Sequence, residues 1–246
     1  MSTSTPAPGP VVLVPRGGSW GQRVADLVTA WGGQPWILPV IHTERADSSV
    51  LTAAQAALAA GSYDWVAITS AAAVPALPAT VDARIAAVGP ATATALREAG
   101  YAVDLVPDGP DYSAEAMLVH WHPTGRVLLL HSDLAGPTLA DGLRDAGAEV
   151  HEVVAYRTVT TELAAEDAGD LRAGRAGAAL VTSGSVARAL AAARVAPTTL
   201  IACLGPRTAT VARECGLDVA LTAPHQQIEA LVEALRQLYS PDPAED

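Results

Sequence analysis

The stretch VHEVVAYRTVTTE, residues 150–162, decides how the chain is organised. Its valines and threonines favour an extended backbone, and the pair Tyr156-Arg157 lies in its middle. A predicted helix that ends at Gly147 precedes it and another predicted helix follows it. We therefore interpret it as a long strand that leaves one body of the protein. An ordinary sheet strand with a polar exit is an equal alternative.

A second stretch, WILPVIHTE at residues 36–44, has the same character. It follows a predicted helix that stops at Gly32-Gly33, and it also continues past its apolar part. We interpret the two stretches as paired crossings between two domains.

Composition bounds the fold and the class of function. The chain has 246 residues, half of them apolar, which suits two domains of about 120 residues each. The net charge is −11, and neither Lys nor Phe occurs. Nucleic-acid binding is disfavoured, because neutralising phosphates needs a basic face. An anionic ligand requires a site that is locally positive.

Cysteines and termini indicate the compartment. Cys203 and Cys215 lack a CxxC or metal-like neighbourhood, so we expect two buried thiols in a reducing compartment. No apolar run approaches the length of a membrane span. Residues 1–10 and 240–246 are expected to be disordered tails, and the first lacks the features of a signal peptide. These observations predict a cytoplasmic protein.

The chain contains an internal repeat. VAITSAAAVPAL at residues 66–77 matches ALVTSGSVARAL at residues 179–190, a shift of 113 residues (179 − 66). AVGPATATALREAGYAVDLV at residues 87–106 matches CLGPRTATVARECGLDVALT at residues 203–222, a shift of 116 (203 − 87). Gly32 matches Gly147 at a shift of 115. Each half is a run of βα units, which predicts an α/β fold with parallel sheets and helices on both faces.

Each half also carries two strand-to-helix turns rich in Thr, Ser and Gly. In open α/β sheets, ligands bind beyond the carboxyl ends of strands, where helix N-termini offer free N–H groups. For a single turn, plain N-capping is the favoured alternative. Two symmetric pairs of turns favour a ligand cleft. The turns are Thr69-Ser70 with Gly89–Thr92, and Thr182–Ser185 with Gly205–Thr208.

Several familiar sites are missing from the sequence. It has no GxGxxG and no Walker A motif, so dinucleotide and nucleoside-triphosphate binding are not indicated. It has no HExxH motif, and we expect its six histidines on the surface or in loops. Ser183 lies in TSGS rather than in GxSxG, so a hydrolase triad is not indicated.

Six segments, in their order and spacing, resemble the uroporphyrinogen-III synthase family. The resemblance runs from about Val11 to Leu238. One departure is His131-Ser132, where many relatives carry Arg-Gly, so no anion-binding role is assigned there. The segments are VVLVPRGGSWGQRVADLVTAWGGQPWILPVI (11–41), VAITSAAAV (66–74), AAVGPATATALREAGYAV (86–103), EVVAYRTV (152–159), LVTSGSVARAL (180–190) and CLGPRTATVARECG (203–216).

The resemblance implies two flavodoxin-like three-layer domains with parallel sheets, joined by a two-stranded linker with a ligand cleft between them. It implies one domain from residues 1–40 plus 160–246 and another from residues 44–154. Residues 40–44 and 155–160 are then the interdomain linkers. The repeat alone predicts contiguous halves, so the resemblance decides this point.

The family cyclises hydroxymethylbilane, a linear tetrapyrrole polycarboxylate, to uroporphyrinogen III in haem biosynthesis. Water is lost, and ring D is inverted through a spiro intermediate. No cofactor and no metal is implied. The resemblance implies a cytoplasmic monomer without nucleic-acid or membrane partners, and a transient contact with the preceding pathway enzyme. The alternative is a non-enzymatic two-lobed module that binds or senses another polyanion. A flavin-binding protein is disfavoured by the few aromatic residues.

The resemblance also implies site residues. Tyr156 matches the family's Tyr on the crossing strand, where a phenol could donate to the leaving hydroxyl. A packed linker Tyr is the alternative. Helix-end interactions contribute roughly 0.3–1 kcal/mol each, so an octacarboxylate needs several, and positioning supplies most of the catalysis. The expected substrate-binding residues are Arg16, Thr69, Ser70, Gly89, Thr92, Thr182, Ser183, Ser185, Gly205 and Thr208.

Overall fold

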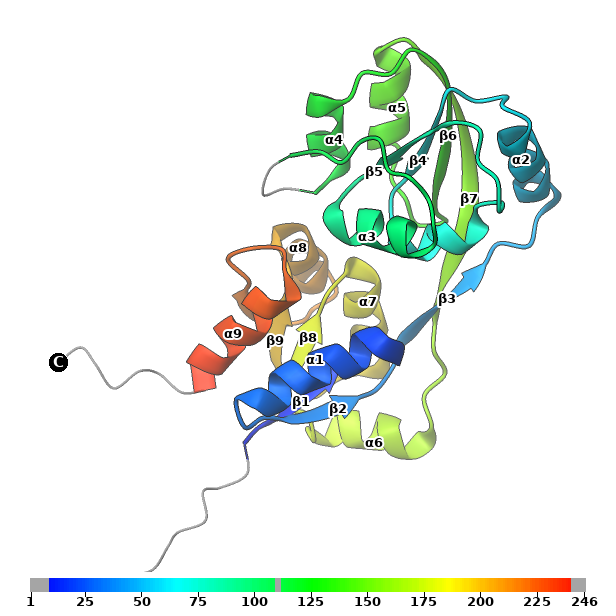
Figure 1. Cartoon of the computed structure of the whole chain (residues 1–246). Coiled ribbons are helices and arrows are strands. Elements are labelled where there is room, and N and C mark those ends of the chain that lie inside the picture. Colours follow the sequence, from blue (N-terminus) through cyan, green and yellow to red (C-terminus); the bar gives the residue numbers. More distant parts are fainter. Residues whose placement is uncertain (1–8, 109–111, 240–246) are drawn as a thin grey trace, which may run out of the picture. The chain divides into compact units, whose positions relative to one another are not determined.

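The computed structural model describes residues 9–108 and 112–239. The predicted tail 240–246 and residues 1–8 of the predicted first tail lie outside the described residues. The chain divides into two compact units (Figure 1). Unit 1 consists of Met1–His42 with Thr160–Asp246, and unit 2 is Thr43–Val159. Each unit is an α/β unit with its own sheet, as the repeat predicts.

The sheet of unit 1 has the strand order β10-β9-β8-β1-β2. Every neighbouring pair in it runs parallel. The carboxyl ends of its strands therefore meet at one edge. The strands are β1 (Val11–Val14), β2 (Gln34–Ile37), β8 (Ala178–Val181), β9 (Leu200–Cys203) and β10 (Val219–Thr222).

Helices cover both faces of this sheet because its strands are apolar on both sides. Val12 and Val14 pack with α1 and α9, whereas Leu13 packs with α6, α7 and α8. Successive side chains of a strand point to opposite faces, so β1 supplies both layers. The helices are α1 (Gly18–Ala30), α6 (Ala165–Ala173), α7 (Gly184–Ala193), α8 (Pro206–Glu214) and α9 (Ile228–Tyr239).

The sheet of unit 2 has the order β3-β7-β6-β4-β5, in which β7-β6, β6-β4 and β4-β5 pair in parallel. Beyond β5, one isolated parallel bridge joins Ala86 to Leu105. The Asp104 carboxylate accepts from the N–H of Ile85 at 2.7 Å, so a side chain supplies part of the pairing. The strands are β3 (Ile41–Arg45), β4 (Trp65–Ile68), β5 (Arg84–Ala87), β6 (Gly125–Ser132) and β7 (Ala148–Thr160).

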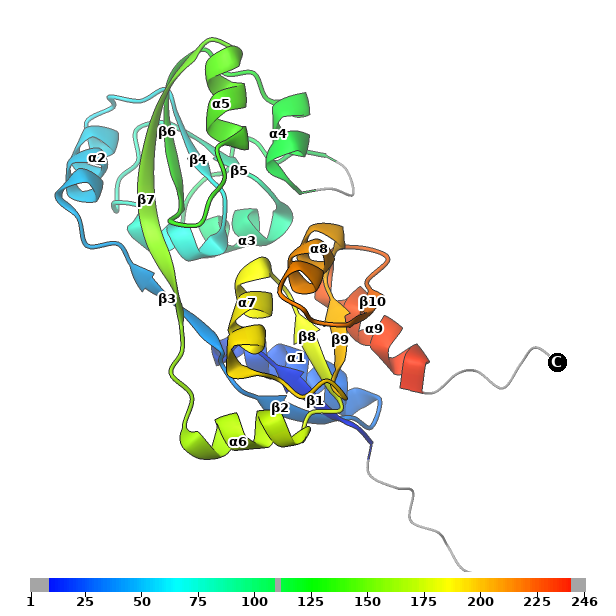
Figure 2. The same ribbon diagram turned by 180° about the vertical axis from the view of Figure 1, so that it is seen from behind.

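Unit 2 also has helices on both faces of its sheet (Figure 2). Val127 and Leu129 of β6 pack with α4 and α5, whereas Leu128 and Leu130 pack with α2, η1 and α3. The helices are α2 (Ser49–Ala59), the 3-10 helix η1 (Ala71–Ala76), α3 (Pro90–Glu98), α4 (Ala114–His120) and α5 (Thr138–Asp145).

The repeat extends to the order of the strands. Unit 1 reads β2-β1-β8-β9-β10, and unit 2 reads β7-β6-β4-β5 followed by the bridge at Leu105. The segment β6-α5-β7 thus takes the place of β1-α1-β2, although it follows β4 and β5 in the chain. The two units therefore share one sheet topology, but the chain begins that topology at a different strand in each unit.

β3 and β7 carry the chain across the boundary between the units. β7 spans 13 residues, close to the predicted stretch 150–162. The N–H of Ala46 donates to the Ala155 carbonyl at 3.0 Å, and that of Thr161 donates to the Val40 carbonyl at 2.9 Å. In the described residues, no helix is long and apolar enough to cross a membrane.

Candidate active site

The carboxyl edge of the unit 1 sheet gathers the predicted residues of that unit. β1, β8 and β9 are neighbours, and a helix starts within four residues of each strand end. The guanidinium of Arg16 lies 5.3 Å from the ring centre of Trp20. The predicted residues at this edge are Arg16, Thr182, Ser183, Ser185, Gly205 and Thr208.

Two of the predicted serines are helix N-caps. Ser183 Oγ accepts from the N–H of Val186 at 3.3 Å, and Ser70 Oγ accepts from the N–H of Ala72 at 3.3 Å. Both serines therefore do cap helices, and their role in substrate binding stays a prediction. In each case the oxygen accepts, so the hydroxyl proton is still available to a carboxylate.

Gly89 and Gly205 cap α3 and α8, and each is followed by a proline at the first helical position. Neither cap offers a side-chain hydrogen bond, and neither helix has an acidic residue in its first turn. The first N–H groups of α3 and α8 therefore face no carboxylate of their own first turn. That arrangement suits an anion.

Close packing by one side chain favours glycine at each cap. The backbone is extended, with φ of −160° at Gly89 and −166° at Gly205, a conformation that any residue adopts. A Cβ on Gly89 would lie 3.0 Å from Tyr112 Cβ, and one on Gly205 would lie 3.0 Å from Gln226 Cγ. Tyr112 and Gln226 are 114 residues apart (226 − 112), whereas the register that relates Gly89 to Gly205 has a shift of 116, so the repeat does not pair them residue for residue. Neither the turn motifs nor the repeat register predicts either residue, and their approach to the caps appears only in the structure.

The carboxyl edge of the unit 2 sheet holds the other predicted binding residues. Thr69 follows β4, and its Oγ1 donates to the Leu130 carbonyl at 3.5 Å. Ser70 and Gly89 are the caps of η1 and α3. Thr92 lies in the first turn of α3 and is buried, with 6 % of its surface exposed. These four residues therefore lie at the ends of two adjacent strands, β4 and β5.

Tyr156 lies on β7 of unit 2 and is 9 % exposed. Its side chain belongs to the core cluster that also contains apolar side chains of η1 and α3. Those are the two helices that Ser70 and Gly89 cap. Within the described residues, the Tyr156 hydroxyl makes no hydrogen bond. The sheet thus brings Tyr156 into the layer that contains the predicted turns of unit 2.

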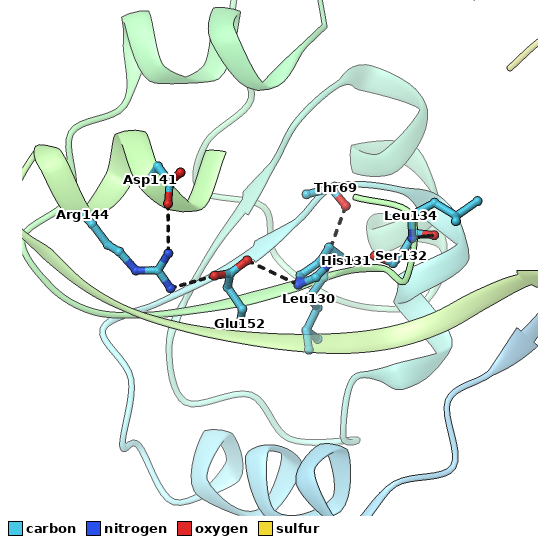
Figure 3. A network of polar contacts seen from close by, with 8 residues as sticks. All are labelled: Thr69, Leu130, His131, Ser132, Leu134, Asp141, Arg144 and Glu152. Atoms are coloured by element: carbon cyan, nitrogen blue, oxygen red, sulfur yellow. Dashed lines mark hydrogen bonds and ion pairs between the residues drawn. The ribbon is translucent and has the colours of Figure 1, made fainter. Parts of the chain in front are cut away.

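A charged network lies on β6, β7 and α5 (Figure 3). Arg144 donates to Glu152 at 2.7 Å and to Asp141 at 3.3 Å. The other Glu152 oxygen lies 3.7 Å from His131 Nε2. The hydrogen bond to Glu152 raises the pKa of Arg144 above its usual value. The network therefore connects α5 to the neighbouring strands β6 and β7.

His131 corrects the expectation that all six histidines lie on the surface or in loops. It lies in β6, and only 13 % of its side chain is exposed. Its Nδ1 is 2.8 Å from the Ser132 carbonyl, which only accepts, so Nδ1 carries a proton. Its Nε2 is buried without a hydrogen-bond partner and faces Glu152. The apolar run before it, LLL at residues 128–130, is the sequence signal for this burial.

The cysteines are only partly as expected. Cys203 is buried at the end of β9, and burial raises the pKa of its thiol to about 11. A thiol of that pKa stays protonated near neutral pH and is a poor nucleophile. Cys215 is partly exposed, because it is the C-cap of α8, so the expectation of two buried thiols is wrong for Cys215. The described residues contain no group of three or more metal-ligating side chains that could hold an ion.

Comparisons with known proteins give one sequence family and matching solved structures. The family model of uroporphyrinogen-III synthase HemD matches residues 22–233. A search of curated proteins finds no match. A uroporphyrinogen-III synthetase structure from Helicobacter pylori aligns with a TM-score of 0.65 at 16% identity, covering 94% of this chain and 99% of that one. A mutant uroporphyrinogen III synthase from Thermus thermophilus aligns with a TM-score of 0.60 at 19% identity, with the same coverage of 94% and 99%. These structural likenesses establish the α/β fold.

Proposed function

The chain belongs to the uroporphyrinogen-III synthase family, and we propose that the strand-end residues described above carry out the family's reaction. The enzyme is a lyase of tetrapyrrole biosynthesis that converts hydroxymethylbilane to uroporphyrinogen III. The match of the family model to most of the chain is the observation that carries this assignment.

The reaction begins with heterolysis of the carbon–oxygen bond of the hydroxymethyl group. The departing hydroxide takes a proton and leaves as water, and the electron pair of the pyrrole nitrogen gives an azafulvene. Ring D then attacks through its substituted carbon, which forms the spiro intermediate. Reopening of that intermediate and closure in the inverted sense give the type III ring, and the last carbon loses a proton.

Tyr156 is proposed as the donor to the leaving hydroxyl. A phenol is a stronger acid than a Thr or Ser hydroxyl, and the Tyr156 hydroxyl has no partner within the described residues. It lies in the same core layer as the helices that start at Ser70 and Gly89. General acid catalysis typically raises the rate about 10²–10⁴-fold. We expect the lower end of that range here, because the azafulvene is stabilised and the hydroxyl leaves more readily.

The substrate carboxylates are proposed to bind at the helix starts. The free N–H groups of α3 and α8 and the hydroxyls beside them suit carboxylate oxygens without any Lys. Arg16 adds one positive side chain in unit 1. The proposed binding residues are Arg16, Thr69, Ser70, Gly89, Thr92, Thr182, Ser183, Ser185, Gly205 and Thr208.

Finer points of the fold and setting are proposals too. The order β2-β1-β8-β9-β10 supports a flavodoxin-like topology, in which the strands follow the pattern 2-1-3-4-5. Five further features stay predictions: the linkers 40–44 and 155–160, the cleft, the monomeric state, the cytoplasmic location and the contact with the preceding enzyme.

The test is incubation with freshly made hydroxymethylbilane, followed by oxidation and separation of the isomers. Solution chemistry gives type I, so we expect type III to dominate and its yield to rise with enzyme concentration. The control is the same reaction with heat-denatured protein. Type I alone at high enzyme concentration contradicts the assignment and favours a polyanion-binding module.

A further inference from the structure

A bulge in β7 determines which way Tyr156 points. β6 and β7 pair residue by residue as far as His131, which lies opposite Val154. The next residue, Ser132, lies opposite Tyr156, so Ala155 is the extra residue of a β-bulge. Such bulges redirect side chains and occur beside active sites.

The effect of the bulge is visible in the core. Successive residues of a regular strand point to opposite faces of a sheet. Tyr156 lies opposite Ser132, which is two residues along β6 from Leu130 and therefore on the same face, and Leu130 and Tyr156 belong to one core cluster with α2, η1 and α3. A regular β7 would send Tyr156 to the other face, away from the turns that begin η1 and α3. The position of the phenol therefore depends on the backbone at this bulge.

Asp133 holds that backbone. β6 ends at Ser132, but the N–H of Asp133 donates to the Tyr156 carbonyl at 3.2 Å. The N–H of Thr158 donates to Asp133 Oδ1 at 3.1 Å. In a parallel ladder, one residue donates with its N–H and accepts with its own carbonyl. The Asp133 carboxylate stands in for that carbonyl, so the ladder continues past the bulge and fixes β7 on both sides of Arg157.

The carboxylate is itself oriented. Asp133 Oδ1 also accepts from Ser132 Oγ at 3.0 Å, and Ser132 Oγ accepts from the N–H of Leu134 at 3.1 Å. Figure 3 shows Ser132 and Leu134 in the turn after His131. Hydrogen bonds to an ionised acceptor are shorter and stronger than those between neutral groups. The turn therefore holds Asp133 Oδ1 in place to accept from the N–H of Thr158.

We propose that Asp133 is a positioning residue for Tyr156. It fixes β7 just beyond the bulge, so that the phenol reaches the leaving hydroxyl of the substrate. The inference rests on the proposed role of Tyr156 in the reaction. Asp133 acts through the backbone of β7, and its loss should lower kcat while leaving substrate binding nearly unchanged.

The first test compares three variants by steady-state kinetics and thermal unfolding. Asp133→Ala removes the acceptor and should lower kcat about tenfold or more, with KM changed less than about threefold. Asp133→Asn keeps an oxygen for the N–H of Thr158 and should restore most of kcat. Asp104→Ala is the matched control, because it removes a carboxylate that accepts a strand N–H, that of Ile85, elsewhere in unit 2. It should lower the unfolding temperature comparably and leave kcat unchanged.

The second test adds Asp133→Ala to Tyr156→Phe. If Asp133 acts through the phenol, the double variant should have the kcat of Tyr156→Phe alone. If the loss of kcat in the double variant equals the product of the two single losses, Asp133 acts independently of the phenol. That result overturns the inference and leaves the role of Tyr156 intact. A wild-type rate for the single variant Tyr156→Phe overturns both. If Asp104→Ala loses as much kcat as Asp133→Ala, the loss comes from lower stability of unit 2. That result also overturns the inference.

Discussion

The side chain of Tyr112 lies against Gly89, the N-cap of α3. A Cβ on Gly89 would be 3.0 Å from Tyr112 Cβ and 3.2 Å from Cγ. A second phenol-bearing side chain therefore lies at one of the proposed binding turns, in the same unit as Tyr156. The two tyrosines differ in placement, since Tyr156 is on β7 and Tyr112 is in the loop before α4. Replacing each tyrosine by Phe shows which of the two hydroxyls takes part in the reaction.

Tyr156→Phe keeps the ring and its packing and removes only the hydroxyl. We expect turnover to fall by at least about tenfold, because the leaving hydroxyl loses its donor. The circular dichroism spectrum and the unfolding temperature should match those of the wild type, since the hydroxyl makes no hydrogen bond in the described part of the chain. Full activity of this variant would rule out the acid role.

Tyr112→Phe preserves the ring that lies against Gly89. We expect near-wild-type turnover, because Tyr112 is not on the strand that carries the proposed donor. The same assay of type III product measures it beside Tyr156→Phe. A large loss in Tyr112→Phe together with an active Tyr156→Phe would move the acid role to Tyr112.

Thr208→Ala removes one proposed carboxylate contact in the first turn of α8. One such contact contributes roughly 0.3–1 kcal/mol, so kcat/KM should fall about two- to fivefold. Thr210→Ala is the control, because Thr210 lies in the same helix and its hydroxyl donates to the Pro206 carbonyl at 3.2 Å, within the helix itself. If Thr208→Ala is inactive while Tyr156→Phe has wild-type activity, binding geometry alone carries the reaction.

Ser183→Ala removes the cap of α7, in which Ser183 Oγ accepts from the N–H of Val186. The free energy of unfolding should fall by about 1 kcal/mol, and by only a few tenths for Ser183→Gly. Urea denaturation of both variants measures this difference. A rise in KM in both variants, beyond the change in stability, would add substrate binding to the capping role.

Cys203 predicts a loss of stability at high pH. Below pH 9 the thiol is protonated in both the folded and the unfolded state. Between pH 9 and pH 11 the unfolded chain loses this proton while the folded protein keeps it, so the free energy of unfolding falls as pH rises. The full loss is about 2–3 kcal/mol. Denaturation at several pH values should show a shallower decline for Cys203→Ala, and equal slopes would refute the burial effect.

Much of the fold follows from local patterns. The long strand expected over residues 150–162 is β7, which spans Ala148–Thr160. Short continuous apolar runs are enough to locate the inner strands such as β4 and β8, because these strands are buried on both faces of a parallel sheet. The interleaved units do not follow from the repeat, which predicts contiguous halves. Nothing in the residue pattern distinguishes the two, since β6-α5-β7 and β1-α1-β2 are alike.

The site was predictable only in part. Strand ends and helix starts locate the turns, because parallel strands bring their carboxyl ends to one edge. The approach of Tyr112 to Gly89, the bulge at Ala155 and the burial of His131 depend on packing between distant segments. Periodicity carries no signal for one extra residue in a strand, so the alignment of Asp133 with Tyr156 appears only in the structure.

The interleaving of the units sets an order of folding during synthesis. Unit 2 is one continuous segment, Thr43–Val159, whereas β1 needs β8 as its neighbour on one side. Because Ala178 and Ala179 leave the ribosome long after Val12 and Leu13, the first β-α-β unit must wait with one edge of β1 unpaired. Unit 2 can therefore fold while unit 1 is still incomplete. Until β8 has been synthesised, the unpaired edge of β1 exposes the chain to misfolding and aggregation.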